Sequence, residues 1–306
     1  MLKRKRAEKA FCRQLAHGEE CLGAKTVWLS SGVALLAFLL ASGLFVQTGT
    51  SKGGRFISAY YYLWYKEGWS VNDDTPQLGW YSSDNESVIR THLEWARAAG
   101  VDFLTLSWSN SPKWYNGETA ITTQKVFDVA DQISSPVKLA IMIEYWHGEF
   151  LNLTDAVEEI YSKYASRPSY FRLYGKPLLF VYTLDDYSPP KWNDTRFTER
   201  YIPLEVPYGR DTFIDRALQE NKTYEFTGVG PHKDNFHVDR NRTDGIYYSE
   251  IWEKVIKFGE MAGEKTVIVI IATFNEWWEG TSIEPSQNYG FQFINLTSSF
   301  AARFKG

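Results

Sequence analysis

The sequence is poor in the residues that build disulfide frameworks and metal sites. Its two cysteines, Cys12 and Cys21, both precede the longest apolar run, so the chain after that run contains no thiol and no disulfide. The five histidines are scattered and show no H-x-x-x-H spacing, which argues against a zinc site. We therefore expect neither a metal nor another cofactor.

Other signatures and charge excesses are also missing. The chain has no G-x-S-x-G nucleophile elbow, no phosphate-binding loop and no glycine-rich fingerprint after its first predicted strand. Its 33 basic and 37 acidic residues nearly balance, giving a net charge of -4. This balance argues against a nucleic-acid partner, since such domains carry a basic surface.

One long apolar segment lies near the start of the chain. Residues 27–46 are uncharged, and about 20 apolar residues suffice to cross the hydrocarbon core of a bilayer. Basic residues before this segment favour a cytoplasmic N-terminus, with the rest of the chain outside or in a lumen. A cleaved signal peptide is the alternative, but the long hydrophilic lead favours an anchor.

We therefore expect four regions and a single-pass type II membrane protein. They are a cytoplasmic basic tail (1–25), a transmembrane signal anchor (26–48), a linker (49–55) and a globular domain (56–306). The domain would lie in the Golgi lumen of a eukaryote or at the cell surface of a prokaryote. Six Asn-x-Ser/Thr acceptor patterns after the anchor agree with export and glycosylation. They are Asn85, Asn152, Asn193, Asn221, Asn241 and Asn295.

Strand-like and helix-like stretches alternate along this domain. Apolar runs rich in aromatic and β-branched residues predict strands at 56–65, 101–108, 137–146, 177–186 and within 265–280, and the less regular middle of the chain adds one at 225–231. Amphipathic patterns predict helices at 87–100, 122–132, 154–165 with Thr154 as the N-cap, 210–220 and 247–263. Apolar strands alternating with helices indicate a parallel sheet covered on both faces. For about 250 residues, a (β/α)8 TIM-like barrel fits best, so the expected fold is that barrel preceded by one transmembrane helix.

Aromatic residues are abundant, and many follow the predicted strands together with acids. Trp, Tyr and Phe make up 16% of the chain, which is compatible with a large core or with a surface that binds carbohydrate. In a barrel, functional residues gather where strands end. The candidates at those ends are Tyr61, Tyr62, Trp64, Ser107, Trp108, Glu144, Tyr145, His147, Tyr182, Asp185 and the run from Asn275 to Glu279.

The stretch "TFNEWWEG" (273–280) contains the strongest chemical pattern. Glu276 and Glu279 follow a buried strand and are separated by two tryptophans. Hydrolysis of a glycosidic bond needs two carboxyl groups with different roles, and a neighbouring indole can raise the pKa of one of them. The alternative is an exposed helix start, where glutamate favours the helix dipole.

The same stretch resembles a known family. "TFNEWWEGTSIE" is similar to the "SFNEWHEGTQIE" pattern of glycoside hydrolase family 99, the endo-acting α-mannosidases. Further segments resemble the family in order and spacing, so the likeness covers nearly all of residues 55–300. They are "SAYYYLWY", "GVDFLTLSWSN", "MIEYW", "YGKPLLFVY" and "VGPHKDNFHVDRNRTDGIYYSEIW".

The resemblance implies a (β/α)8 barrel and retaining hydrolysis within an α-mannoside chain of a glycan, without a metal. It assigns Glu276 to deprotonate the substrate's 2-hydroxyl, which then attacks the anomeric carbon, and Glu279 to act as acid and then base. It further implies contacts to substrate or to the catalytic carboxylates. These come from Tyr62, Trp108, Glu144, Tyr145, Arg242, Tyr247 and Asn275, although Arg242 and Tyr62 also suit structural roles.

Two departures concern the substrate more than the reaction. Trp278 stands where the family usually has histidine, and the loop "GPHKDN" is short, so that His232 is a candidate for the family's tyrosine position. A glycan on Asn241 would crowd the site, so we expect this acceptor to be unoccupied. Two other interpretations stay open: a glycosyltransferase-like protein of polysaccharide biosynthesis, and a catalytically silent glycan-binding barrel.

Overall fold

The computed structural model describes residues 53–71, 74–113, 115–144, 152–182, 200–206, 228–229, 242 and 245–306. They belong to one compact unit, Ser51–Gly306. The predicted tail, the predicted anchor and the helix expected at 210–220 lie outside the described residues.

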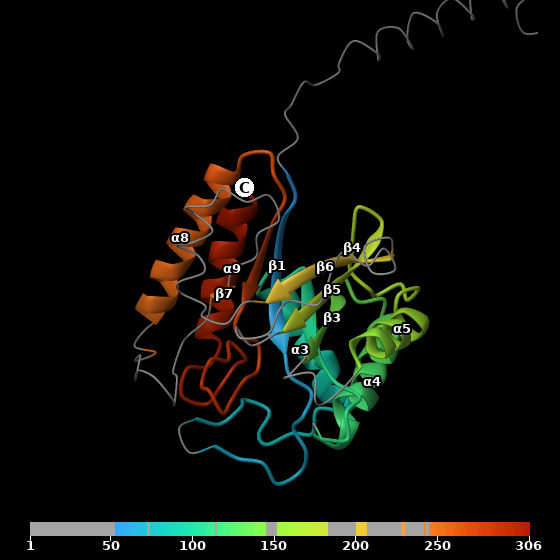
Figure 1. The fold of residues 1–306 in the computed structure, drawn as a ribbon. Coiled ribbons are helices and arrows are strands. Elements are labelled where there is room, and N and C mark those ends of the chain that lie inside the picture. Colours follow the sequence, from blue (N-terminus) through green and yellow to red (C-terminus); the bar gives the residue numbers. More distant parts are fainter. Residues whose placement is uncertain are drawn as a thin grey trace, which may run out of the picture. The chain divides into compact units, whose positions relative to one another are not determined.

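A predominantly parallel sheet organises this unit (Figure 1). Its order is β6-β5-β3-β2-β1-β8-β7, and β4 pairs with β5 in antiparallel fashion. The strands are β1 (Arg55–Tyr61), β2 (Phe103–Trp108), β3 (Lys138–Glu144), β4 (Arg172–Leu173), β5 (Lys176–Tyr182), β6 (Ile202–Val206), β7 (Gly228–Val229) and β8 (Val267–Ile271).

The strand order carries the signature of a barrel. β1 pairs in parallel with β2 on one side and with β8, the last strand, on the other. From β1 the order ascends through β2, β3, β5 and β6 in one direction and descends through β8 and β7 in the other. A doubly wound sheet would instead reverse at a switch point between consecutive strands. The predicted α/β class is confirmed, whereas pairing between β6 and β7, and an eighth parallel strand, stay predictions.

Side chains along each strand alternate between two buried clusters. On β3, Ile141 and Ile143 belong to a large cluster that the sheet shares with the helices. Ala140 and Met142 belong to a second cluster, whose members come from strands and the residues beside them. Because successive side chains of a strand point to opposite faces, the second cluster is the interior of the curled sheet. Burial on both faces explains why these strands are apolar throughout.

The helices cover the outer face of the sheet. In Figure 1, α8 and α9 lie side by side at one edge, and α4 and α5 lie at the other. Each helix buries an apolar stripe in the large cluster. The helices are α3 (Glu86–Ala98), α4 (Glu118–Gln132), α5 (Leu153–Tyr164), α8 (Ile246–Ala262) and α9 (Gln292–Lys305).

Comparison with the sequence predictions gives one correction and three omissions among the strands and α-helices. The predicted cap Thr154 lies inside α5, and the Asn152 side chain caps this helix by accepting hydrogen bonds from the amides of Thr154 and Asp155. Asparagine is among the strongest N-cap residues. Strands β4 and β6 and helix α9 were not predicted. In the described part of the chain, no helix has the length and apolarity needed to cross a membrane.

Candidate active site

The interior face of the sheet gathers polar side chains where the strands end. Tyr62 follows β1, Ser107 lies near the end of β2, and Glu144 ends β3. The Ser107 hydroxyl donates a 2.7 Å hydrogen bond to Glu144 Oε1, and both side chains are buried. Tyr182 ends β5 and packs beside the interior cluster. Four neighbouring strands therefore present oxygen atoms toward one end of the interior, as the barrel hypothesis predicted.

Trp108 lies on the opposite face of β2. It is fully buried and belongs to the cluster shared with the helices, one residue out of phase with Ser107. A shift of one residue along a strand moves a side chain to the other face of the sheet. This position favours a core role for Trp108 over the predicted contact with sugars.

The loop after β8 holds the two glutamates in a narrow turn. The amide of Thr273 donates to the carbonyl of Thr281 at 3.0 Å, and the amide of Ile283 donates back to Thr273 at 3.0 Å. The amide of Phe274 donates to Tyr60 at 2.8 Å, which joins the loop to β1. We call residues 273–284 the acid loop. These hydrogen bonds hold its two arms together and attach it to β1.

Asn275 joins the acid loop to the end of β1. Its Oδ1 accepts a 2.7 Å hydrogen bond from the Tyr62 amide, and its Nδ2 donates to the Tyr62 carbonyl at 2.9 Å. The side chain is fully buried, so both backbone groups would otherwise lack partners. Asn275 thus aligns the loop with the strand; this is its visible role, and a sugar contact stays a prediction.

Glu276 is buried and its carboxylate is oriented by the loop itself. It is 3% exposed, and Oε1 accepts a 2.9 Å hydrogen bond from the Trp278 amide. The Tyr65 hydroxyl lies 3.4 Å from the same oxygen, and the shorter of its two donor contacts is to the Asn275 carbonyl, at 2.9 Å. The Tyr65 hydroxyl also accepts from the Trp277 amide at 2.9 Å. A buried carboxylate in a hydrogen-bonded turn does not match the alternative of an exposed helix start, which is therefore wrong for Glu276.

Glu279 meets a wetter environment three residues further on. Its side chain is partly exposed, and the preceding residue, Trp278, is 37% exposed. The pair therefore consists of one buried, fixed carboxylate and one carboxylate with access to solvent. Acid–base catalysis uses such asymmetry, because two carboxyl groups in unlike surroundings can hold different protonation states.

Glu284, the last residue of the acid loop, is another buried carboxylate, and it joins the loop to neighbouring elements. Glu284 Oε2 accepts hydrogen bonds from Trp277 Nε1 at 2.8 Å and from the Tyr81 hydroxyl at 2.7 Å. Glu284 Oε1 lies 3.1 Å from His92 Nε2, and His92 Nδ1 lies 2.8 Å from the Tyr61 hydroxyl. The carboxylate thus has partners for both oxygens, as a buried charge requires.

Three aromatic rings pack together beside the acid loop. Trp64 stacks on Tyr115 with ring centroids 5.0 Å apart and on Trp278 with centroids 5.8 Å apart. We call Trp64, Tyr115 and Trp278 the aromatic rim. Partial burial, and then the negative charges of Glu276 and Glu144, raise the pKa of Tyr115 to about 12. The Tyr115 hydroxyl therefore lies within electrostatic range of Glu276 in the acid loop and of Glu144 at the end of β3.

The remaining predicted residues lie in different places. Arg242 donates a hydrogen bond to the Ser282 carbonyl and lies over the rings of Tyr289 and Phe293. Burial lowers its pKa to about 10, so it stays charged at neutral pH. Its visible role is to brace the acid loop. Tyr247 is half-buried in the first turn of α8. Tyr145, His147, Asp185, His232 and Asn241 lie outside the described residues.

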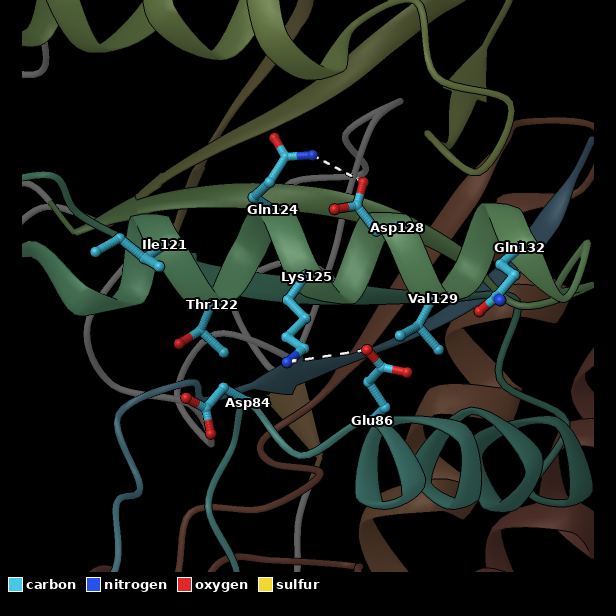
Figure 2. Close-up of a pocket in the computed structure, with 9 residues that line it drawn as sticks. All are labelled: Asp84, Glu86, Ile121, Thr122, Gln124, Lys125, Asp128, Val129 and Gln132. Atoms are coloured by element: carbon cyan, nitrogen blue, oxygen red, sulfur yellow. Dashed lines mark hydrogen bonds and ion pairs between the residues drawn. The ribbon is translucent and has the colours of Figure 1, made fainter.

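A separate hollow of about 540 Å³ lies between α3 and α4 (Figure 2). Its lining mixes Asp84, Glu86 and Asp128 with Lys125, which pairs with Glu86 at 3.9 Å. Neither glutamate of the acid pair lines it. We therefore place the candidate active site at the strand ends. Among the described side chains, no group of three or more His, Cys, Asp and Glu residues is arranged to bind a metal ion.

Sequence reasoning missed several residues that build this site. Glu284 is the last residue of "TFNEWWEGTSIE", and His92 lies on the apolar stripe of α3. An ionisable residue in an otherwise buried segment indicates a hydrogen-bond partner elsewhere in the fold. This indication applied to Glu284 and to His92. Tyr65 and Tyr81 gave no such signal, because tyrosine is common in cores and at surfaces alike.

Comparisons with known proteins identify similar sequences. The model of the family described as glycosyl hydrolase family 99 matches residues 68–232, which end before the acid loop. The chain is 26% identical over 265 residues to a glycoprotein endo-alpha-1,2-mannosidase-like protein of Homo sapiens, covering 68% of this chain and 56% of that protein. It is 23% identical over 265 residues to a glycoprotein endo-alpha-1,2-mannosidase of Rattus norvegicus, with 68% and 56% covered. The chain thus spans a little over half the length of these curated relatives.

Solved structures show the same fold. A family 99 endo-alpha-mannosidase from Bacteroides thetaiotaomicron superposes with a TM-score of 0.61 at 20% identity, covering 81% of this chain and 97% of that one. A second structure of that enzyme, in complex with BIS-TRIS-propane, gives a TM-score of 0.62 with the same coverage. The family model accounts for more than half of the sequence, and the fold agrees with it. The chain therefore belongs to glycosyl hydrolase family 99.

Proposed function

We propose that the chain is a retaining glycoside hydrolase that cleaves internal α-mannosidic or closely related linkages of a glycan. Membership of the family supports the reaction class, and the names of the curated relatives support an α-mannoside as substrate. The observation that carries the proposal is the unlike pair in the acid loop. Glu276 is buried and held by the Trp278 amide, while Glu279 is partly exposed.

The proposed first step uses the substrate's own 2-hydroxyl as the nucleophile. Glu276 accepts the proton of that hydroxyl as its oxygen forms a bond to the anomeric carbon. Glu279 donates a proton to the glycosidic oxygen, so that the bond from the anomeric carbon to the leaving sugar breaks. The products of this step are the released glycan and a 1,2-anhydro sugar.

The second step restores the enzyme. Glu279, now a carboxylate, takes a proton from water as the water oxygen attacks the anomeric carbon. The bond between that carbon and the 2-oxygen breaks, and Glu276 returns its proton to the 2-oxygen. Net addition of one water with retained configuration follows from two displacements at the same carbon.

The anchor and the glycans belong to the same proposal. We place residues 26–48 in a membrane with the barrel on the lumenal or extracellular side, supported by their apolar composition and the basic residues before them. Three acceptors, Asn85, Asn152 and Asn295, lie in the described residues and are exposed, as attachment of a glycan requires. Protease protection of microsomes, with and without a glycosidase that removes N-glycans, tests both points.

Hydrolysis is tested with the full-length chain in mild detergent and a panel of α-mannan and high-mannose oligosaccharides. Release of internal fragments by the parent, and its loss in Glu279→Gln, would support the proposal. Binding without release would identify a glycan-binding protein instead. Turnover that depends on an added sugar nucleotide would favour the transferase interpretation and overturn hydrolysis.

A further inference from the structure

A chain of buried hydrogen bonds connects helix α3 to the acid loop. His92 lies on α3 and is fully buried, and its two ring nitrogens have different partners. Nε2 lies 3.1 Å from Glu284 Oε1, and Nδ1 lies 2.8 Å from the Tyr61 hydroxyl at the end of β1. The rings of Tyr61, Tyr81 and Phe274 pack around the imidazole. The imidazole therefore joins α3, β1 and the acid loop in the protein core.

The partners of His92 determine which of its nitrogens carries a proton. Burial raises the pKa of Tyr61 and the charge of Glu284 adds to this effect, so the Tyr61 hydroxyl keeps its proton. Within the described part of the chain, the only hydrogen-bond partner of that hydroxyl is His92 Nδ1, which therefore accepts. An imidazole that accepts through Nδ1 carries its proton on Nε2. This Nε2–H group then donates to Glu284 Oε1.

Glu284 extends the chain to the residue beside the proposed base. Its Oε2 accepts a 2.8 Å hydrogen bond from Trp277 Nε1, and Trp277 is 3% exposed. Trp277 directly follows Glu276, and its amide donates to the Tyr65 hydroxyl, which lies 3.4 Å from Glu276 Oε1. The indole of Trp277 thus ties the peptide that bears Glu276 to Glu284, and through Glu284 to His92.

We propose that His92 is a positioning residue for the reaction: its Nε2–H holds the Glu284 carboxylate in the orientation that binds the Trp277 indole, and this fixes the place of Glu276. The inference rests on the proposed function, in which Glu276 takes a proton from a sugar hydroxyl. A misplacement of about 1 Å can slow a reaction about 10²-fold. Because His92 is fully buried, it acts through Glu284 and not by contact with substrate.

A positioning role and a purely structural role predict different kinetics. If His92 only satisfies its buried neighbours, its replacement lowers stability, but the molecules that remain folded keep the parent's kcat. If His92 positions Glu276, kcat falls in the folded protein. KM then changes little, because the groups that bind the substrate are retained.

Two amide side chains that differ by one methylene separate these roles. The amide nitrogen of glutamine can take the place of Nε2 and donate to Glu284, whereas asparagine is too short and replaces only the Nδ1 side. His92→Gln and His92→Asn are compared in the full-length chain for kcat and KM on high-mannose oligosaccharide, at a temperature where circular dichroism shows both folded. Tyr170→Phe is the matched control. It removes a buried hydroxyl that donates to the Leu178 carbonyl near the start of β5.

We expect His92→Asn to lower kcat by about 30-fold and to change KM by less than about threefold. His92→Gln should keep kcat within about threefold of the parent, and Tyr170→Phe should lower Tm without changing kcat. Equal kcat values for the two His92 variants, with an active parent, would overturn the positioning role alone. A parent that releases no sugar would overturn the proposed function and the positioning role together.

Two further measurements test the route through Glu284. Glu284→Gln and the double variant Glu284→Gln/His92→Asn should have the same kcat, because His92 then has no carboxylate to hold. A further fall in the double variant would show that His92 acts independently of Glu284 and would overturn the route. Nitrogen-15 NMR of labelled histidine, with the signal assigned through His92→Gln, should show the His92 proton on Nε2 alone. A proton on Nδ1 would overturn the proposal, whatever the activity of the parent.

Discussion

The buried floor of the site and its aromatic rim are stabilised in different ways. The floor consists of Asn275, Glu276 and Glu284, which are 0–3% exposed and receive hydrogen bonds from backbone amides, indole and phenol groups. The rim consists of rings that stack on one another, two of them more than a third exposed. Hydrogen bonds fix direction, whereas stacked rings tolerate sliding.

This difference matches two tasks. Proton transfer requires a carboxylate oxygen within hydrogen-bond reach of a defined proton, so small displacements of Glu276 would slow the reaction. Recognition of a sugar face requires area more than direction. We therefore expect substitutions in the floor to affect catalysis and stability strongly, and substitutions in the rim to affect affinity.

The largest expected effect comes from Glu276→Gln. The amide oxygen of glutamine can still accept from the Trp278 amide and the Tyr65 hydroxyl, so the loop should keep its shape. Loss of the base should lower kcat by about 10³-fold. The rate of oligosaccharide release measures this. Glu253→Gln, at an exposed surface pair with Arg303, is the control. A kcat within tenfold of the parent would remove Glu276 from the proposed mechanism.

Glu284→Ala should produce the largest loss of stability. It leaves the donors of Trp277, Tyr81 and His92 buried without their acceptor. We expect a loss of about 3 kcal/mol in the free energy of unfolding, and a fall in Tm of roughly 6–12 °C. Thermal unfolding followed by circular dichroism measures it. Glu260→Ala, at an exposed position of α8, should leave Tm nearly unchanged. Equal Tm values for the two variants would contradict a structural role for Glu284.

Tyr65→Phe should affect both catalysis and stability, to a smaller degree. The variant loses one hydroxyl that contacts Glu276 and accepts from the Trp277 amide. An unpaired buried amide costs about 1–2 kcal/mol, and a less well oriented Glu276 should lower kcat by about tenfold. Tyr174→Phe is the matched control. The Tyr174 hydroxyl also forms a hydrogen bond, to Thr266, but Tyr174 is 65% exposed. The prediction is wrong if the two variants behave alike in the release assay.

Sequence patterns were sufficient to predict the strands that are apolar along their whole length. Apolar runs gave β1, β2, β3, β5 and β8, because strands buried on both faces are apolar throughout. The position of Glu276 after the last strand placed it at the site. Helix α9 was not predicted, although its apolar residues recur at helical spacing. Strand β6 was not predicted because proline and glutamate interrupt its short apolar run.

The partners within the site could not be predicted in the same way. The contact of Asn275 with Tyr62 spans 213 positions, and that of His92 with Glu284 spans 192. Such contacts depend on which strands become neighbours, and a single sequence does not give that. Trp108 illustrates the limit at short range, since one residue of register decides whether a side chain faces the interior or the helices.

The smallest expected effect tests whether floor and rim act on each other. Burial is the larger cause of the raised pKa of Tyr115, and the charges of Glu276 and Glu144 add to it. A negative charge disfavours the phenolate, so removing one in Glu276→Gln should lower the Tyr115 pKa from about 12 toward the ordinary phenol value of about 10 without reaching it. Titration of ¹³C-labelled tyrosine by NMR, with the signal assigned through Tyr115→Phe, measures the change.

The control for this titration is Glu159→Gln. That carboxylate raises the pKa of Tyr164, and it is not among the causes that act on Tyr115. If Glu276→Gln lowers the Tyr115 pKa while Glu159→Gln leaves it in place, the Tyr115 ring lies within the electrostatic reach of Glu276. If neither variant changes the Tyr115 pKa, the rim is electrostatically separate from the floor, and substitutions in one should leave the properties of the other unchanged.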